Sequence, residues 1–344
     1  MPAILIWNIQ HSSGFQDSFS EKNNLINEVL ENCIRDQGVT AVILLEITSR
    51  ESVEQFARNR QLDLTIHGDG SSLKYAVLTK GAHRCTDVTP YFPSFSDKPR
   101  GVVHVGFGSM PALLITHIKS DSGDSGLACL SDICKQLPEN MHSNSQRWPQ
   151  AGVIALADWN LEAKNAEIVA NLFQAKIVAP SMPTRYSSIA VDKITSPKVG
   201  EKTLDYACVF GGLKYSPSIS AMVPDIFYER SVGFIFEKYL DHIKGKRRIL
   251  KQEIQKREDE LKAALDSKKA GKNITNTTLK ALQSALEVPQ NEKIVYDVAK
   301  RTVRTLYERI GARARLTDTD QQAIHQLITQ PGMGPDHLPV VIKW

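Results

Sequence analysis

The chain has 344 residues, 42% of them hydrophobic and 23% charged, a composition that is ordinary for a soluble globular protein with a substantial core. No apolar run is long enough to span a bilayer. The five cysteines are odd in number and form no C-x-x-C pair, which argues against a disulfide framework and a zinc site and favours reduced thiols in the cytoplasm.

The net charge of +4 is unevenly distributed. Between Glu229 and Arg315 there are 21 Lys and Arg against 12 Asp and Glu, which leaves 21 against 26 in the rest of the chain. The sequence is therefore an acidic body with a basic segment. Such a segment is typical of proteins with a polyanionic partner, a nucleic acid or a membrane surface, but a solvated helical face has the same composition.

From the N-terminus to about residue 225, short apolar runs alternate with loops and helices. The first run, "AILIWNI", lacks a basic leader and indicates a strand rather than a signal peptide. Helical spacing follows over Ser20 to Asp36 and over Ser49 to Arg60. The other strand-like runs are rich in Ile, Val and Leu: "VTAVILLEI", "YAVLTK", "GVVHVGF", "ALLITHI", "GVIALADWN" and "LDYACVF". Several lack polar alternation, which predicts strands covered on both faces and a layered α/β domain.

The pattern changes to helical between residues 226 and 330. Apolar residues from Leu240 to Ala264 recur at three- and four-residue spacings, which predicts a long amphipathic helix with a coiled-coil-like seam. "SKKAGKNITN" interrupts it, and helices are predicted over Thr278 to Glu287 and Glu292 to Ile310, then after Thr317 to Asp320. "VVIKW" is again strand-like. We therefore predict a body of residues 1–225 plus 331–344 and a basic helical insertion, a hairpin or small bundle, over 226–330.

Polar residues recur at the ends of the apolar runs, where ligands gather in α/β sheets. They are Asn8, Glu46, His117, Asp158, Asn160, Asp205, Asp336 and His337. Each one alone is better explained as a strand-terminating turn residue. Together they suit phosphodiester hydrolysis, which needs a hard cation held by oxygen atoms, a group that takes a proton from water, and donors for the phosphate charge. The spacing alone assigns no roles.

The ordered set "WNI", "LLE", "THI", "ADWN", "LDYACV" and "PDHLPV" resembles the endonuclease/exonuclease/phosphatase superfamily over residues 1 to about 225 and 334 to 344. The resemblance implies a four-layered α/β sandwich, with the helical insertion placed before the last strand. It also implies that Asn8 and Glu46 lie at a Mg²⁺ ion, with Mn²⁺ as the alternative ion. Asp336 would complete this acidic metal site.

The same resemblance supplies the other roles. Asp158 and Asn160 would position the nucleophile and the scissile phosphate. Asp205 would pair with His337, which would act as general base or bind the phosphate. His117 would stabilise the phosphate or assist the leaving group.

The substrate follows from the branch of the superfamily. "KPRGVVHVGFGSMPALLITHIKS" and "LDYACV" resemble the bacterial deoxyribonuclease branch, whose phosphate-contacting arginine Arg100 would match, and Arg185 falls in a substrate-side loop. Motifs usual in inositol-polyphosphate phosphatases and in abasic-site endonucleases are absent from the sequence. The prediction is a Mg²⁺-dependent nuclease acting on DNA.

The basic insertion would contact nucleic acid through Lys246, Arg247 and Arg248. Self-association or a protein partner through the insertion is the alternative role for this segment. Two alternatives also remain for the whole chain. One is a phosphatase or a phospholipid or inositol-phosphate phosphodiesterase on the same fold, and the other is a non-catalytic binding module that uses the helical arm.

Overall fold

A computed structural model of the chain provides the structure. It describes residues 3–9, 21–36, 38–47, 50–68, 74–95, 101–107, 112–118, 123–143, 152–180, 184–185, 202–210, 225–312, 317, 320, 323–324 and 337–343. Of these, 21–25, 74, 123–124, 139–143, 225–235 and 238 are described by their backbone alone. The chain divides into two compact units, one of residues 1–187, 200–227 and 329–344, the other of residues 188–199 and 228–328.

The first unit contains two mixed β-sheets. The first sheet has the strand order β11-β1-β2-β4-β3 and the second β5-β6-β7-β8-β10-β9. The strands of the first sheet are β1 (Ala3–Asn8), β2 (Val39–Ile47), β3 (Asp63–His67), β4 (Lys74–Thr79) and β11 (Val340–Lys343). Those of the second are β5 (Arg84–Asp87), β6 (Val103–Gly106), β7 (Ala112–His117), β8 (Val153–Asp158), β9 (Lys176–Val178) and β10 (Asp205–Phe210). The pairs β1–β2 and β7–β8 are parallel, and the others are antiparallel.

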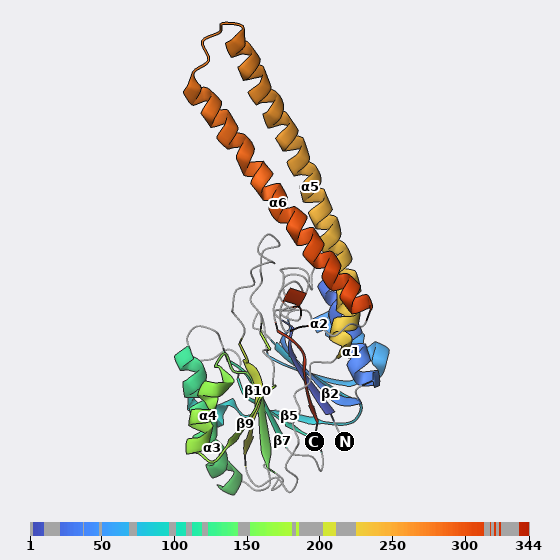
Figure 1. Cartoon of the computed structure of the whole chain (residues 1–344). Coiled ribbons are helices and arrows are strands. Elements are labelled where there is room, and N and C mark those ends of the chain that lie inside the picture. The colour runs from blue at the N-terminus through green and yellow to red at the C-terminus, as the bar shows by residue number, and fades with distance from the viewer. Residues whose placement is uncertain are drawn as a thin grey trace. The chain divides into compact units, whose positions relative to one another are not determined.

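The two sheets face each other across a shared apolar core. Alternate residues of both sheets meet there, as in Ile4 and Ile6 of β1 against Ile154 and Leu156 of β8. The outer face of the first sheet lies against α1 (Glu21–Asp36) and α2 (Arg50–Arg60), and that of the second against α3 (Gly123–Ser143) and α4 (Ala163–Leu172). Figure 1 shows the resulting layers, and the predicted four-layered α/β sandwich is confirmed.

The helices that cover the sheets follow from amphipathic spacing. In α2, Val53, Phe56 and Ala57 are buried at i, i+3 and i+4, and in α1 buried Ile26 and Val29 share one face in the same way. Two 3-10 turns, Thr89–Tyr91 and Pro93–Phe95, connect β5 to β6. Strands β3, β5 and β9 and helices α3 and α4 were not predicted. The three strands are short edge strands with half-exposed side chains, so they lack the continuous apolar run that marked the others.

A long helical hairpin precedes the last strand. It consists of α5 (Asp225–Lys269) and α6 (Asn276–Gly311), which run antiparallel in Figure 1. The predicted seam lies in α5, where Ile243 and Leu250 are buried. The break predicted between the helices is also present: the Thr275 hydroxyl accepts a hydrogen bond from the Thr278 amide at 3.1 Å and caps α6. After the hairpin, β11 pairs with β1, so the helical segment is an insertion before the last strand.

The predicted division of the second arm helix was wrong. Thr278 to Glu287 and Glu292 to Ile310 form one helix, α6, with Pro289 inside it. An interior proline disfavours a helix by about 3 kcal/mol or more, because it removes a backbone hydrogen bond. Here Pro289 is itself buried, and the same helix buries Ala299 and Val303. Continuous packing of one apolar face therefore outweighs the local preference to break.

Within the part of the chain that the structure describes, none of the helices is both long enough and apolar enough to cross a membrane.

Candidate active site

Strand register places three polar residues in one row of the second sheet. His117, the last residue of β7, is the partner of Asp158 at the end of β8, and Asp158 is the partner of Asp205 at the start of β10. Two residues earlier on their strands, Ile115 and Leu156 lie in the core between the sheets. Because side chains alternate along a strand, His117 and Asp158 also face the first sheet. All three members of the row are buried.

The first sheet contributes Asn8 and Glu46, whose side chains are directed inward by different backbone geometries. Asn8 ends β1 and shares the inward face with Ile4 and Ile6. Glu46 follows inward-facing Leu45, so strict alternation would turn its side chain outward. Instead β2 is irregular between Leu44 and Ile47, and Glu46 has a φ of 60°. This bulge redirects the carboxylate inward, where Glu46 Oε1 lies 3.2 Å from His117 Nε2.

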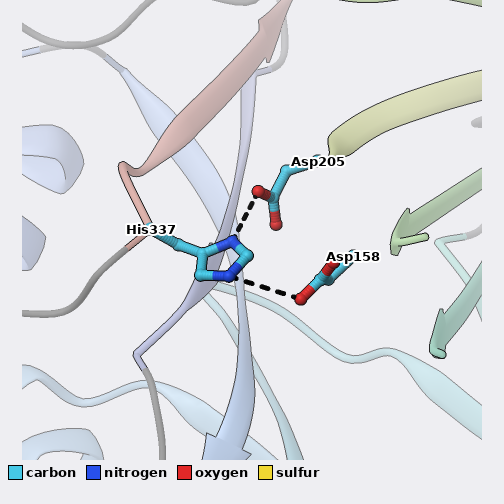
Figure 2. Close-up of side chains that lie close together, drawn as sticks. All are labelled: Asp158, Asp205 and His337. Atoms are coloured by element: carbon cyan, nitrogen blue, oxygen red, sulfur yellow. Dashed lines mark hydrogen bonds and ion pairs between the residues drawn. The ribbon is translucent and has the colours of Figure 1, made fainter. Parts of the chain in front are cut away.

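His337 precedes β11 and is fixed through its backbone. Its carbonyl accepts a hydrogen bond of 2.9 Å from the Trp7 indole, and the next amide, of Leu338, donates to the Thr184 carbonyl at 2.7 Å. Figure 2 shows the imidazole between two carboxylates: Nδ1 is 2.7 Å from Asp205 Oδ2, and Nε2 is 3.5 Å from Asp158 Oδ2. Each ring nitrogen therefore faces one acid.

Asp205 is anchored by the fully buried Thr184. The Thr184 hydroxyl oxygen accepts hydrogen bonds of 3.0 Å from the backbone amides of both Leu204 and Asp205. Burial raises the pKa of Asp205, and the charge of Asp158 acts in the same direction, against the attraction of His337. Among the described residues, the buried Oδ1 of Asp205 has no hydrogen-bond partner. A buried acceptor in this state is costly and is suited to a ligand or water.

Asp158 is the most highly connected group of the site. Burial alone would raise the pKa of Asp158, but the charge of His337, the contact with His117 and the hydrogen bond from Asn8 outweigh it and lower the pKa well below its usual value. Asn8 Nδ2 donates to Oδ2 at 2.9 Å and the Asn160 amide donates to Oδ1 at 3.1 Å. Asn160 has a φ of 46°, and its side chain donates to the Ile118 carbonyl at 2.6 Å. Asp158 is therefore held as a fixed anion.

The oxygen donors of this site fit a divalent cation. Glu46 and Asp158 both contact Nε2 of His117, at 3.2 and 3.4 Å. One ring nitrogen carries a single proton and satisfies one carboxylate well, so a cation would stabilise the second charge. Carboxylate and amide oxygens are the donors that Mg²⁺ prefers, and Asn8, Glu46 and Asp158 supply them. The Glu46 side chain remains 14% exposed, whereas that of Asp158 is 1% exposed, so Glu46 lies on the solvent side of the site.

A second group of potential ligands overlaps the first. Side-chain atoms of Asp158, Asp205 and His337 lie within 4.8 Å of one another. In this arrangement both nitrogens of His337 face carboxylates, so coordination by the imidazole would compete with its contact to Asp205 or Asp158. We therefore favour the oxygen donors around Glu46 for a hard cation.

Six further residues were predicted for the site: Arg100, Arg185, Lys246, Arg247, Arg248 and Asp336. Arg100 and Asp336 are outside the described residues. Arg185 forms antiparallel bridges with both Lys202 and His337, so its backbone borders the site. Lys246 and Arg248 are exposed on α5, whereas Arg247 forms an ion pair with Asp297 of α6 and is half-buried.

Sequence reasoning missed the supporting roles of Gly126 and of the Trp159–Tyr206 pair. Gly126 in α3 allows close approach to the loop after β8, because a Cβ at this position would lie 2.7 Å from the Trp159 carbonyl oxygen. Trp159, next to Asp158, stacks on Tyr206 with ring centroids 5.7 Å apart and donates to the Tyr206 carbonyl at 3.0 Å. A glycine inside a predicted helix is the sequence signal that could have indicated this close contact between the helix and the loop. The stacked pair has no comparable signal.

Several solved structures are similar to this chain. Truncated TDP2 from Caenorhabditis elegans matches at 16% identity, 64% of this chain, 88% of that chain and a TM-score of 0.44. A mannosyl-6-phosphatase from Bacteroides thetaiotaomicron matches at 11% identity, 64% and 87% coverage and a TM-score of 0.44. An endonuclease/exonuclease/phosphatase family protein from the same species matches at 10% identity, 64% and 84% coverage and a TM-score of 0.43. No family model matches the chain, and no curated protein matches it significantly. The functional assignment therefore rests on the side chains of the site.

Proposed function

We propose that this chain is a divalent-metal-dependent phosphodiesterase of the endonuclease/exonuclease/phosphatase superfamily, specifically a Mg²⁺-dependent nuclease that cleaves DNA. The observation that carries the proposal is the position of His337, with Nδ1 at 2.7 Å from Asp205 and Nε2 facing Asp158. A buried Asp–His pair next to a set of oxygen donors can activate a water molecule near a bound cation. The ordered motifs of the sequence supply the superfamily.

Asp205 and His337 form the proton-transfer pair in this proposal. Asp205 Oδ2 accepts a hydrogen bond from the protonated Nδ1 of His337. Nε2 is therefore the unprotonated nitrogen that can act as a base. His337 takes a proton from the attacking water at Nε2, and Asp205 stabilises the imidazolium that forms. The protonated Nε2 then faces Asp158, 3.5 Å away, which compensates the new charge.

The other side chains hold the cation and the phosphate. Asn8 and Glu46 would hold Mg²⁺, or Mn²⁺ in its place, and by resemblance Asp336 would belong to the same acidic site. When bound, the ion supplies charge stabilisation at the phosphate and the leaving oxygen. His117 would stabilise the phosphate or assist the leaving group, and Asp158, which accepts a hydrogen bond from the Asn160 backbone amide, would orient the water.

The substrate-side residues extend the proposal to nucleic acid. Arg185 lies beside His337 through its backbone bridge, and Arg100 is assigned by resemblance. On the helical arm, Lys246, Arg247 and Arg248 belong to the basic run of α5. Cations on a helix can follow a phosphate backbone, and this supports a polymeric substrate over a small phosphomonoester.

A substrate panel tests the proposal. Supercoiled plasmid, linear duplex and single-stranded DNA, RNA, bis(p-nitrophenyl) phosphate, p-nitrophenyl phosphate and soluble inositol phosphates are incubated with Mg²⁺, Mn²⁺ or EDTA. The expected result is nicking of plasmid and hydrolysis of the diester with Mg²⁺, with EDTA abolishing both. Turnover of the monoester or inositol phosphates alone would replace the nuclease by a phosphatase, and inactivity on the whole panel would favour a binding module.

A further inference from the structure

Some cations of the helical arm form ion pairs and others are exposed without one. Arg247 of α5 pairs with Asp297 of α6 across the hairpin, whereas Lys293, Arg257 and Arg304 pair within their own helices. Lys244, Arg248 and Lys251 of α5 are exposed, and none of the three forms an ion pair with any residue that the structure describes. We call these three residues the α5 cationic face.

The spacing of the α5 cationic face makes it unfavourable in isolation. Lys244, Arg248 and Lys251 stand at i, i+4 and i+7, so they lie along one side of the helix. Like charges at these separations destabilise a helix. Arg248 and Lys251 have no acidic residue three or four positions away on their own helix, where compensation would normally come from. The repulsion between Arg248 and Lys251 is therefore not compensated from within their own helix.

The second helix of the hairpin carries an exposed cation at the level of Lys244. The Arg247–Asp297 ion pair and the Phe236–Tyr307 ring contact set the antiparallel register of α5 and α6. In this register Arg301, one turn beyond Asp297, stands at the level of Lys244. Arg301 is also exposed. Cations from both helices therefore gather at one level of the arm.

We propose that the α5 cationic face is a docking surface for the phosphate backbone of a nucleic acid. Three cations over seven residues span about 10 Å at 1.5 Å per residue, which equals the rise of about three nucleotides of one duplex strand. A repeating polyanion removes the repulsion along the whole row, whereas a single acidic side chain neutralises one member. Arg247 acts differently from its neighbours, because its pairing with Asp297 holds the hairpin together. The inference rests on the proposed function for the choice of nucleic acid as substrate.

The test compares two triple variants of the full chain that lose the same charge. The first is Lys244→Ala, Arg248→Ala and Lys251→Ala. The control is Lys262→Ala, Lys272→Ala and Lys280→Ala, three exposed lysines from the other end of the hairpin. DNA affinity is measured with a catalytically inactive His337→Ala background at several salt concentrations, and circular dichroism checks that helix content is retained. Hydrolysis of bis(p-nitrophenyl) phosphate is measured in the active background.

The two variants distinguish an effect of where the cations lie on the arm from an effect of the total charge removed. Loss of three phosphate contacts flattens the slope of log K against log salt by about 2–3 for DNA, and the control variant keeps the wild-type slope. The control variant leaves hydrolysis of the small diester unchanged. Equal slopes in both variants, or binding to anionic lipid vesicles without binding to DNA, would overturn the docking surface. If the wild type hydrolyses no phosphoester at all, the proposed function fails, while the slopes still decide the docking surface.

Discussion

Replacement of Asp205 by Asn tests the proton-transfer pair. The two side chains have nearly the same shape, so the buried strand end should keep its packing, while the acceptor for the His337 Nδ1 proton loses its charge. The bond removed is short, 2.7 Å, and buried. Hydrogen bonds to charged groups contribute about 1.5–3 kcal/mol, and each 1.36 kcal/mol is about tenfold in rate. Asn can also donate to Nδ1 and stabilise the wrong tautomer, so we expect a loss of about 10²-fold or more in kcat.

The assay is the initial rate of diester hydrolysis at saturating Mg²⁺ as a function of pH. If His337 is the base, the wild-type rate rises with pH, and the rising limb moves to lower pH in Asp205→Asn because the imidazolium is less stabilised. Asp63→Asn, at an exposed carboxylate of β3, is the matched control and should behave as wild type. A rate and pH profile of Asp205→Asn equal to those of Asp63→Asn would refute the reasoning.

Four further predictions concern the metal, the site's supports and the arm. Glu46→Gln should keep the fold and lose most Mg²⁺-dependent turnover, measured by rates against Mg²⁺ concentration; full activity at saturating Mg²⁺ would remove Glu46 from the site. Thr184→Val leaves two buried amides without an acceptor and should lower the free energy of unfolding by about 2 kcal/mol or more in urea denaturation, with Thr184→Ser restoring it. Gly126→Ala should lower the free energy of unfolding by about 1–3 kcal/mol, because the added Cβ meets the Trp159 carbonyl. Gly245→Ala, with open space around the added Cβ, should not lower it. At Asp297, burial raises the pKa but Lys293 and Arg247 lower it further, so its contribution to stability is present above the ordinary carboxyl pKa and lost as pH falls below it; Asp297→Asn should lose on the order of 0.5 kcal/mol at pH 7 and little at pH 3 in thermal melts.

The sequence predicted the site residues that follow regular strands. Asn8 and Asp158 end apolar runs, and because side chains alternate, period two alone places them on the inner faces of their sheets. Glu46 could be named as a candidate, but the direction of its side chain could not be predicted, because this direction depends on a left-handed backbone conformation at a bulge. The contact of His337 with Asp205 joins residues 132 positions apart. No local sequence pattern predicts a contact between residues so far apart in the chain. The resemblance to the superfamily motifs predicted this contact instead.

Elements whose stability comes from tertiary packing were the ones that local patterns missed. The edge strands β3, β5 and β9 are half-exposed and short, and their existence depends on pairing with a neighbour already in place. Pro289 indicated a helix end, but the surrounding apolar face of α6 continues through it. The anchoring role of Thr184 depends on two backbone amides about twenty residues further along the chain, which composition and spacing do not reveal.

Metal-dependent diester hydrolysis by the wild type beside His337→Ala is the most direct test of the central claim, that this buried cluster is a metal-assisted phosphodiesterase centre. Bis(p-nitrophenyl) phosphate is followed at pH 7.5 during titration with Mg²⁺ and then with EDTA, and circular dichroism confirms that both proteins are folded. The account predicts saturable, EDTA-reversible turnover in the wild type and a loss of about 10²-fold or more in His337→Ala. Metal-independent turnover in the wild type, or equal rates in the two proteins, would contradict it.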